Sequence, residues 1–276
     1  MRPLFVSKLK VDSLEIAIAD LPPHLEGTRL VQLSDFHYDG VRLSDALLDE
    51  AIATSNRLEP DLVFLTGDFV TRDTQPVHRL VRHLKHLQTR AGIYAVLGNH
   101  DNHYPHSIRE ITAALTQIGI RVLCNEIVYP LGSELAIVGF PDLFSKQFYP
   151  ESVMKSIPET LPRIVLSHNP DTAAMLQPWR VDLQLSGHTH GGQIVLPLIG
   201  ALPGWLQKIR RKIPRHLRWL FPFRSGCLHI FKHWEWASGL HPVGDNTLYV
   251  NRGLGTYFPG RFNCPPELTL ITLTRK

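Results

Sequence analysis

The sequence predicts an α/β fold in which two mixed β-sheets pack face to face, with helices on the outside. Short apolar segments alternate with segments of helical periodicity in the first half of the chain, and short strands predominate after Gly119. The 276 residues are 43% hydrophobic, which is enough for one large core. We therefore expect one domain over residues 1–276, with a basic aromatic insertion at about 197–240.

Several apolar runs are expected to be buried strands, because each is short and is followed by glycine or a polar residue. They are Leu30–Leu33, Asp61–Leu65, Ile93–Leu97, Arg163–Leu166 and Val181–Leu185. Parallel strands present functional groups at their carboxyl ends. The polar residues that follow these runs in the sequence are therefore expected to lie at one edge of the sheet. Later strands are expected at residues 122–123, 127–128, 135–138, 248–251 and 268–273.

Three segments between the predicted strands have helical spacing. They cover residues 43–52, 77–87 and 108–118. Pro60 closes the first segment. Pro76 opens the second at an early position, where its missing N–H does no harm, and Gly119 ends the third.

Short polar motifs follow these strands in a fixed order. They are Asp35-Phe36-His37, Gly67-Asp68, Gly98-Asn99-His100-Asp101, His168 and Gly187-His188-Thr189-His190. Asp35 and His37 alternate on one extended segment, so their side chains point to the same side. Alone, this pair would fit a turn aspartate and a surface histidine about as well. Together the motifs predict a hydrolase with two divalent ions, and ligands without thiolate suit Mn, Fe or Zn.

The motifs, in this order, resemble the signature of the calcineurin-like metallophosphoesterase superfamily. Further stretches resemble its YaeI/YkuE-like phosphodiesterase branch: Leu33–His37, Ser186–Gln193, Val250–Gly255 and Arg261–Glu267. The resemblance covers roughly residues 10–198 and 240–275. It implies the four-layer αββα sandwich of the metallophosphoesterase fold, which agrees with the strand and helix pattern.

The resemblance also implies a ligand set for each metal ion. The first ion would take Asp35, His37, Asp68 and His190, and the second Asp68, Asn99, His168 and His188. Asp68 would therefore bridge the two ions, which lower the pKa of bound water and so generate the nucleophile. His100 is left unligated and is expected to protonate the leaving group, with Asp101 as the residue that orients it.

Two residues are candidates for substrate binding. Arg72 matches an arginine that contacts phosphate in phosphatase relatives, and the alternative is a solvated loop charge. His103 follows the catalytic loop, and the alternative for this residue is an ordinary helix entry. Those relatives carry an aspartate three residues after the bridging aspartate, where this chain has Thr71, so that His–Asp pair is absent.

The segment between the two regions of resemblance has an unusual composition. Residues 201–240 contain eight Lys and Arg against Glu235, a net charge of +7, which leaves −3 for the rest of a chain whose total is +4. The segment holds four of the five tryptophans: Trp205, Trp219, Trp234 and Trp236. Residues 191–207 are uncharged, but Pro and Gly interrupt them too often for a membrane-spanning helix.

Residues 208–220 are predicted to form a basic amphipathic helix, broken or entered at Pro214. Tryptophan mixed with Lys and Arg is typical of a helix in a bilayer interface, so 201–240 predicts contact with an anionic membrane surface. A lid over the active site or a protein-binding surface is the alternative, and nucleic acid is ranked last. In the membrane interpretation, Trp205, Trp219, Arg210 and Arg211 make the contact.

The leading functional prediction is a phosphohydrolase with two metal ions that cleaves a phosphoester or pyrophosphate on an amphiphilic or lipid-linked substrate at a membrane. The alternatives are a soluble phosphodiesterase or phosphatase and a non-catalytic metal-binding scaffold. Three scattered cysteines form no disulfide framework, and we expect no secretory signal at the N-terminus. We expect a cytoplasmic location, extending to peripheral attachment at the inner face of a membrane. The sequence does not choose a substrate or an oligomeric state.

Overall fold

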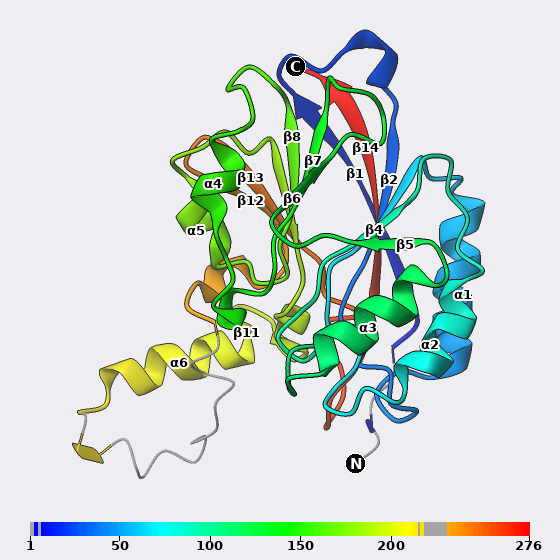
Figure 1. Cartoon of the computed structure of the whole chain (residues 1–276). Helices are drawn as coiled ribbons and strands as arrows, with labels where there is room; N and C mark the ends of the chain where they lie inside the picture. Colours follow the sequence, from blue (N-terminus) through cyan, green and yellow to red (C-terminus); the bar gives the residue numbers. More distant parts are fainter. Residues whose placement is uncertain (1–2, 5–6, 215, 218–230) are drawn as a thin grey trace.

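Two mixed β-sheets pack face to face in the computed structural model, and helices cover both outer surfaces (Figure 1). The structure describes residues 3–4, 7–214, 216–217 and 231–276. This arrangement of four layers, helix–sheet–sheet–helix, confirms the predicted fold class. The predicted extent of the domain, 1–276, stays a prediction.

The first sheet, within the described residues, has the order β1-β14-β2-β3-β4-β5. Its strands are β1 (Lys10–Ile18), β2 (Arg29–Leu33), β3 (Leu62–Leu65), β4 (Ile93–Ala95), β5 (Ile120–Val122) and β14 (Glu267–Arg275). Strands β2 to β5 are parallel to one another, whereas β14 runs antiparallel to β2 and parallel to β1. The carboxyl ends of β2, β3 and β4 therefore meet at one edge.

The second sheet, in the part of the chain that the structure describes, has the order β12-β13-β9-β8-β7-β6. Its strands are β6 (Glu126–Val128), β7 (Ala136–Gly139), β8 (Arg163–Leu166), β9 (Leu183–Ser186), β12 (Gly239–Val243) and β13 (Asn246–Val250). Strands β7, β8, β9 and β13 are parallel, and β6 and β12 pair antiparallel at the two ends.

The two sheets share one apolar interface. Leu30 and Phe64 of the first sheet belong to the same buried cluster as Ile137, Ile164 and Leu185 of the second. The main polar exception on this face is Gln32, which is fully buried. Its side-chain amide donates to the Thr66 hydroxyl and to the Ser186 carbonyl, both at 2.9 Å, and so joins the sheets by hydrogen bonds.

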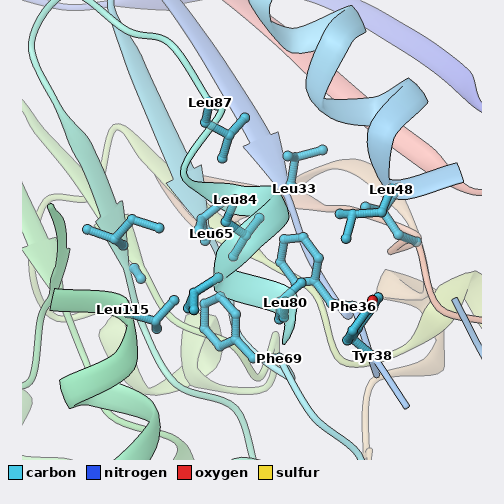
Figure 2. Packing of buried hydrophobic residues seen from close by; sticks show 14 of the residues in the cluster. Leu33, Phe36, Tyr38, Leu48, Leu65, Phe69, Leu80, Leu84, Leu87 and Leu115 are labelled. Atoms are coloured by element: carbon cyan, nitrogen blue, oxygen red, sulfur yellow. The ribbon is translucent and has the colours of Figure 1, made fainter. Parts of the chain in front are cut away.

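Helices α1 (Asp45–Arg57), α2 (Val77–Leu84) and α3 (Ser107–Thr116) cover the outer face of the first sheet. Figure 2 shows their apolar side chains packed with those of the sheet, and Leu48, Leu80 and Leu115 belong to the same buried cluster as Leu33 and Leu65. Alternate residues of β2 point to the two sides of the sheet, which explains why Leu33 faces these helices while Leu30 faces the other sheet.

Short helices cover the second sheet. Helices α4 (Pro150–Met154) and α5 (Thr172–Leu176) bring Met154 and Leu176 onto the buried side chains of Val138 and Val165. Short 3-10 helices and the remaining elements complete the described chain: η1 (Pro23–Leu25), η2 (Leu143–Ser145), η3 (His190–Gly192), η6 (Trp234–Trp236), β10 (Val195–Leu196), β11 (Gly200–Ala201) and α6 (Leu202–Lys212).

Two predicted helices need correction. The second predicted helix ends at Leu84 rather than at Leu87, which packs into the same core from the following turn. The basic helix begins at Leu202 and ends at Lys212, not at 208 and 220, because Ile213 is extended before Pro214. The predicted helical residues 215 and 218–220, including Trp219, lie outside the described residues. No helix among those described is long and apolar enough to cross a membrane.

Candidate dinuclear metal centre

The candidate ligands lie where strand ends of both sheets meet. Asp35 and His37 follow β2, Asp68 follows β3 and Asn99 follows β4. On the second sheet, His168 follows β8, while His188 and His190 follow β9. The fold therefore brings seven side chains, remote in sequence, to the facing edges of two sheets.

The candidate ligand atoms form three groups within each of which all atoms lie within 4.8 Å of one another. The groups are Asp35–His37–His190, His37–Asp68–His100 and Asp68–His168–His188. Asp68 belongs to two of the groups, and its Oδ2 lies 3.4 Å from His37 Nε2 and 3.1 Å from His168 Nε2. A carboxylate in this position can serve two cations.

Backbone carbonyls determine which ring nitrogens can bind a cation. Nδ1 of His168 lies 2.7 Å from the Thr66 carbonyl, and Nδ1 of His190 lies 3.2 Å from the Gly255 carbonyl. A carbonyl only accepts, so both rings must carry their hydrogen on Nδ1. Their Nε2 lone pairs then point into the site, which is the usual arrangement for metal-binding histidine.

A further contact between two of the rings would suit a cation. Nε2 of His37 lies 3.0 Å from Nε2 of His190, while Nδ1 of His37 lies 3.0 Å from the Tyr257 hydroxyl. The Tyr257 hydroxyl can donate to His37 Nδ1 or accept from it; when it accepts, the Nε2 lone pairs of His37 and His190 face each other and repel. A divalent cation between the nitrogens would convert this repulsion into two ligand bonds.

Asn99 gives an independent test of the metal interpretation. Its Oδ1 is buried, and none of the described residues donates a hydrogen bond to it. A buried acceptor without a partner is costly, and a cation would satisfy it. The donor set of carboxylate, amide and imidazole therefore fits two divalent ions.

Burial and neighbouring charges shift the pKa values of two acids of the site, Asp35 and Asp68, in opposite directions. Burial and the nearby Asp68 raise the pKa of Asp35 to about 6, although the His168 ring opposes the shift. Burial alone would also raise the pKa of Asp68, but the neighbouring His168 and His100 rings hold it well below its usual value. The carboxylate common to two groups is therefore the one most strongly held in its charged form.

Most candidate ligands have a strained backbone. Their φ angles are positive: 51° at Asp35, 41° at His37, 56° at Asp68, 72° at His188 and 52° at His190. Residues other than glycine rarely adopt this region, and such strain concentrates at functional sites. The surrounding loops must hold these residues in place.

Glycine in the motifs lets neighbouring loops approach the carboxylates. A Cβ on Gly98 would lie 2.2 Å from Oδ1 of Asp68, and one on Gly187 would lie 2.3 Å from Oδ2 of Asp35. No side chain fits at either position. Gly98 and Gly187 thus allow backbone N–H groups to bind the acids, as in the 3.0 Å contacts from the His188 N–H to both oxygens of Asp35.

His100 lies beside the ligands, and a backbone carbonyl holds its ring. Nδ1 of His100 lies 2.7 Å from the Thr71 carbonyl, so the hydrogen on Nδ1 leaves Nε2 to exchange a proton. Its backbone N–H donates to Asp68 at 2.9 Å. The carbonyl of Thr71 thus contacts the ring even though its side chain cannot supply the carboxylate found in relatives.

The expected role of Asp101 as the orienting partner of His100 is wrong. The buried carboxylate of Asp101 accepts the backbone N–H groups of Phe69 at 2.8 Å, Val70 at 3.1 Å and Gly98 at 2.9 Å. With its oxygens used in this way, Asp101 joins the loops behind β3 and β4. It therefore acts on the position of Asp68 rather than on the ring of His100.

Neither candidate substrate residue lines the pocket at the site. Arg72 and His103 are exposed, on the loops that follow β3 and β4. The His103 ring contacts the Tyr104 ring edge to face at 4.8 Å between centroids. Their contact with substrate stays a prediction.

Sequence reasoning missed three groups beside the site. Tyr257 bonds His37, and the guanidinium of Arg42 lies over the Tyr257 ring at 4.6 Å from its centroid. Asp142 follows β7 and is buried, and its Oδ1 has no hydrogen-bond partner among the described residues. Burial raises the pKa of Asp142 to about 6. A signal existed for Asp142, because it follows an apolar run as the other acids do.

A cavity of ≈ 410 Å³ opens directly onto the site. Its polar wall includes Asp68, Asn99, His100, His188 and His190. The rest of its lining is mainly apolar or aromatic and includes Pro203, Phe231, Trp234, Tyr257 and Phe258. The cavity can therefore hold a phosphoryl group against the candidate ligands and an apolar or aromatic group against this aromatic wall.

Part of the aromatic wall comes from the predicted insertion. A Cβ on Gly204 of α6 would lie 2.8 Å from the Trp234 side chain, so this glycine lets α6 pack on η6. Thr189 stands between the candidate ligands His188 and His190 in the sequence, and its hydroxyl donates to the Ala237 carbonyl at 2.5 Å. The insertion is thus attached to the metal-site loop itself.

Comparison with known proteins agrees with this geometry. The family model described as calcineurin-like phosphoesterase matches residues 28–192. UDP-2,3-diacylglucosamine pyrophosphatase LpxG of Chlamydia muridarum is 31% identical, over 95% of this chain and 88% of its own. Phosphodiesterase YaeI of Escherichia coli is 32% identical over 89% of this chain and 82% of its own. Metallophosphoesterase YkuE of Bacillus subtilis, which is uncharacterized, is 32% identical over 92% and 82%.

Proposed function

Because the chain belongs to the calcineurin-like phosphoesterase family and is a hydrolase, we propose that it uses two divalent metal ions to cleave an amphiphilic phosphoester or pyrophosphate at a membrane surface. The observation that carries the proposal is the pocket that candidate ligands line together with an aromatic wall. The ligands suit a phosphoryl group, and the wall suits an apolar one.

Each ion would be held by four side chains. One set is Asp35, His37, Asp68 and His190, and the other is Asp68, Asn99, His168 and His188. When bound, such ions activate water and offset the charge of the phosphoryl oxygens. The residues fit Mn, Fe or Zn and do not choose among them.

His100 is the proposed proton donor. Its Nδ1–H bonds the Thr71 carbonyl, so a second proton on Nε2 can pass to the leaving oxygen as its bond to phosphorus breaks. With a cation at Nε2 of His37, its Nδ1–H would donate to the Tyr257 hydroxyl, 3.0 Å away, which would hold the ring in place. Arg72 and His103 are proposed to contact the part of the substrate that extends beyond the pocket.

The substrate class follows from the aromatic wall and from one relative. Phe231 lies beside the His188 ring at 6.4 Å between centroids and packs edge to face on Trp234 at 5.4 Å. A small polar phosphoester would leave this wall in contact with water. LpxG is by name a pyrophosphatase of a diacylated sugar nucleotide, and a related lipid-linked pyrophosphate is the substrate class proposed here.

A panel of phosphomonoesters, phosphodiesters and lipid pyrophosphates tests the proposal, with Mn²⁺, Fe²⁺ or Zn²⁺ added, with and without anionic vesicles. We expect the amphiphilic substrates to be the best, and vesicles to increase their turnover. Faster hydrolysis of small esters, unaffected by vesicles, would favour a soluble phosphodiesterase. No turnover by the metal-loaded protein on any substrate would favour the non-catalytic scaffold.

A further inference from the structure

Large apolar side chains are exposed on segments that adjoin the pocket, whose lining includes Gln193, Pro203 and Phe258. Leu4, Leu198, Ile199, Trp205, Phe258 and Phe262 are each at least 40% exposed. We call these six residues the apolar rim. Phe258 also lines the pocket, so the apolar rim continues from the aromatic wall to the surface. Figure 1 shows α6, β11 and the start of the chain at one end of the molecule.

Backbone hydrogen bonds join the segments that carry the apolar rim. The Val195 N–H, in the β10–β11 hairpin, donates to the Phe262 carbonyl at 2.9 Å. The Leu4 N–H donates to the Pro259 carbonyl at 2.8 Å. The N-terminal segment, the hairpin and the loop before β14 therefore lie side by side, although they are far apart in the sequence.

Leu198 at the tip of the hairpin is unfavourable in two ways. Its relative exposure is 108%, so its side chain is fully in water. Its φ is 67°, a conformation that suits Gly or Asn and strains a leucine. The folded chain gains nothing from leucine here, so a contact outside the chain is the better explanation for it.

The charge around the apolar rim indicates what binds there. From Gly187 to Trp234 the sequence contains no acidic residue, and α6 ends in Arg210, Arg211 and Lys212. Apolar side chains beside a basic helix match a bilayer with anionic headgroups. The apolar side chains would enter the boundary of the acyl chains, and the basic side chains would lie at the headgroups. A protein partner would have to offer both an apolar and an acidic surface.

We propose that the apolar rim inserts into an anionic lipid bilayer, with Leu198 and Phe262 as its leading side chains, and sets the pocket mouth against the lipid. This inference rests on the proposed function and specifies its membrane contact. It differs from the prediction for 201–240, because five of the six rim residues lie outside that segment. An amphiphilic substrate could then enter the pocket without leaving the bilayer.

The test measures binding of the full chain to vesicles without any substrate. Vesicles contain phosphatidylcholine alone or mixed with phosphatidylglycerol, at low and high salt. Transfer of each exposed Leu or Phe into the bilayer should strengthen binding by roughly 10-fold or more. We therefore expect Leu198→Asn with Phe262→Ser to weaken binding to the mixed vesicles at least that much, and high salt to weaken it further.

The control replaces two exposed apolar residues that lie elsewhere, Tyr129→Ser with Met175→Ser, and should bind as the parent does. Equal loss in both double variants, or no binding by the parent at low salt, would overturn the proposal. The proposal would also fail if the parent does not bind vesicles but forms dimers that the double variant Leu198→Asn with Phe262→Ser disrupts. The apolar rim would then contact a second copy of the chain.

Thermal unfolding gives a readout that does not depend on lipid. Leu198→Asn should leave the melting temperature unchanged or raise it, because Asn tolerates the positive φ. A clear decrease would mean that Leu198 supports the fold, and the proposal would fail. Hydrolysis of a small soluble ester separates the two hypotheses: turnover without vesicle binding refutes the membrane contact alone, and binding without turnover refutes the proposed catalysis alone.

Discussion

Replacement of His100 by alanine gives the sharpest test of the proposed chemistry. The ring lies beside the candidate ligands, and its Nδ1 is 2.7 Å from a carbonyl that fixes its hydrogen. Loss of a positioned proton donor slows a reaction by about 10²–10⁴-fold, equivalent to roughly 3–5 kcal/mol in the barrier. We expect this loss for an alkyl ester, whose leaving oxygen is strongly basic. A nitrophenyl ester needs no proton and should lose much less.

The assay compares the two esters under metal saturation, and metal content is measured by elemental analysis. The control is His106→Ala, which removes an exposed histidine from the end of the same loop, where α3 begins. His100 lies in one of the groups that could hold an ion, so metal content is decisive. Loss of bound metal in His100→Ala, or an equal loss of rate on both esters, would refute the role as proton donor.

Other predictions concern the ligands and the acids around them. Asp68→Asn should release metal and abolish hydrolysis; retention of both ions, measured by elemental analysis, would contradict its place in two ligand groups. Tyr257→Phe removes the bond to His37 and should weaken metal binding by about 10–100-fold in a titration, more than Phe258→Leu nearby does. The buried Asp142 carboxyl has a pKa raised from 3.8 to about 6. Between these pH values the folded chain binds more protons at Asp142 than the unfolded chain does. The unfolding free energy of the parent therefore falls as the pH rises through this window. We therefore compare the unfolding free energy of Asp142→Asn with that of the parent by denaturant unfolding without metal. The variant's value minus the parent's should increase by roughly 2–3 kcal/mol between about pH 4 and pH 7. A difference that does not change with pH would contradict the raised pKa.

The positions of the candidate ligands could be predicted from the sequence because apolar runs ended in polar motifs. The physical reason is that parallel strands bring their carboxyl ends together whatever the loops do. The contact from Thr71 to His100 uses a backbone carbonyl, for which a side-chain pattern carries no signal. Tyr257 was missed because it reaches His37 from a loop 220 residues away in the sequence.

Two elements show where local patterns mislead. Strand β1 (Lys10–Ile18) was missed because it is an edge strand, exposed over much of its length, so its sequence mixes charged and apolar residues. Helix α6 was placed too late because Pro203 and Gly204 suggested an interruption. Proline is tolerated in the first turn of a helix, and Gly204 is required there by the Trp234 side chain.

The place of β14 in the first sheet has a consequence for the order in which the chain folds. Among the described strands, β1 pairs with β14 alone, and β14 lies between β1 and β2. The first strand to be synthesised therefore has no partner until the last has appeared. The Gly255 carbonyl and the Tyr257 hydroxyl, which hold two histidine rings, also come late in synthesis. A growing chain would thus carry all seven candidate ligands well before the site can close, and early metal capture would involve histidines that can still rotate.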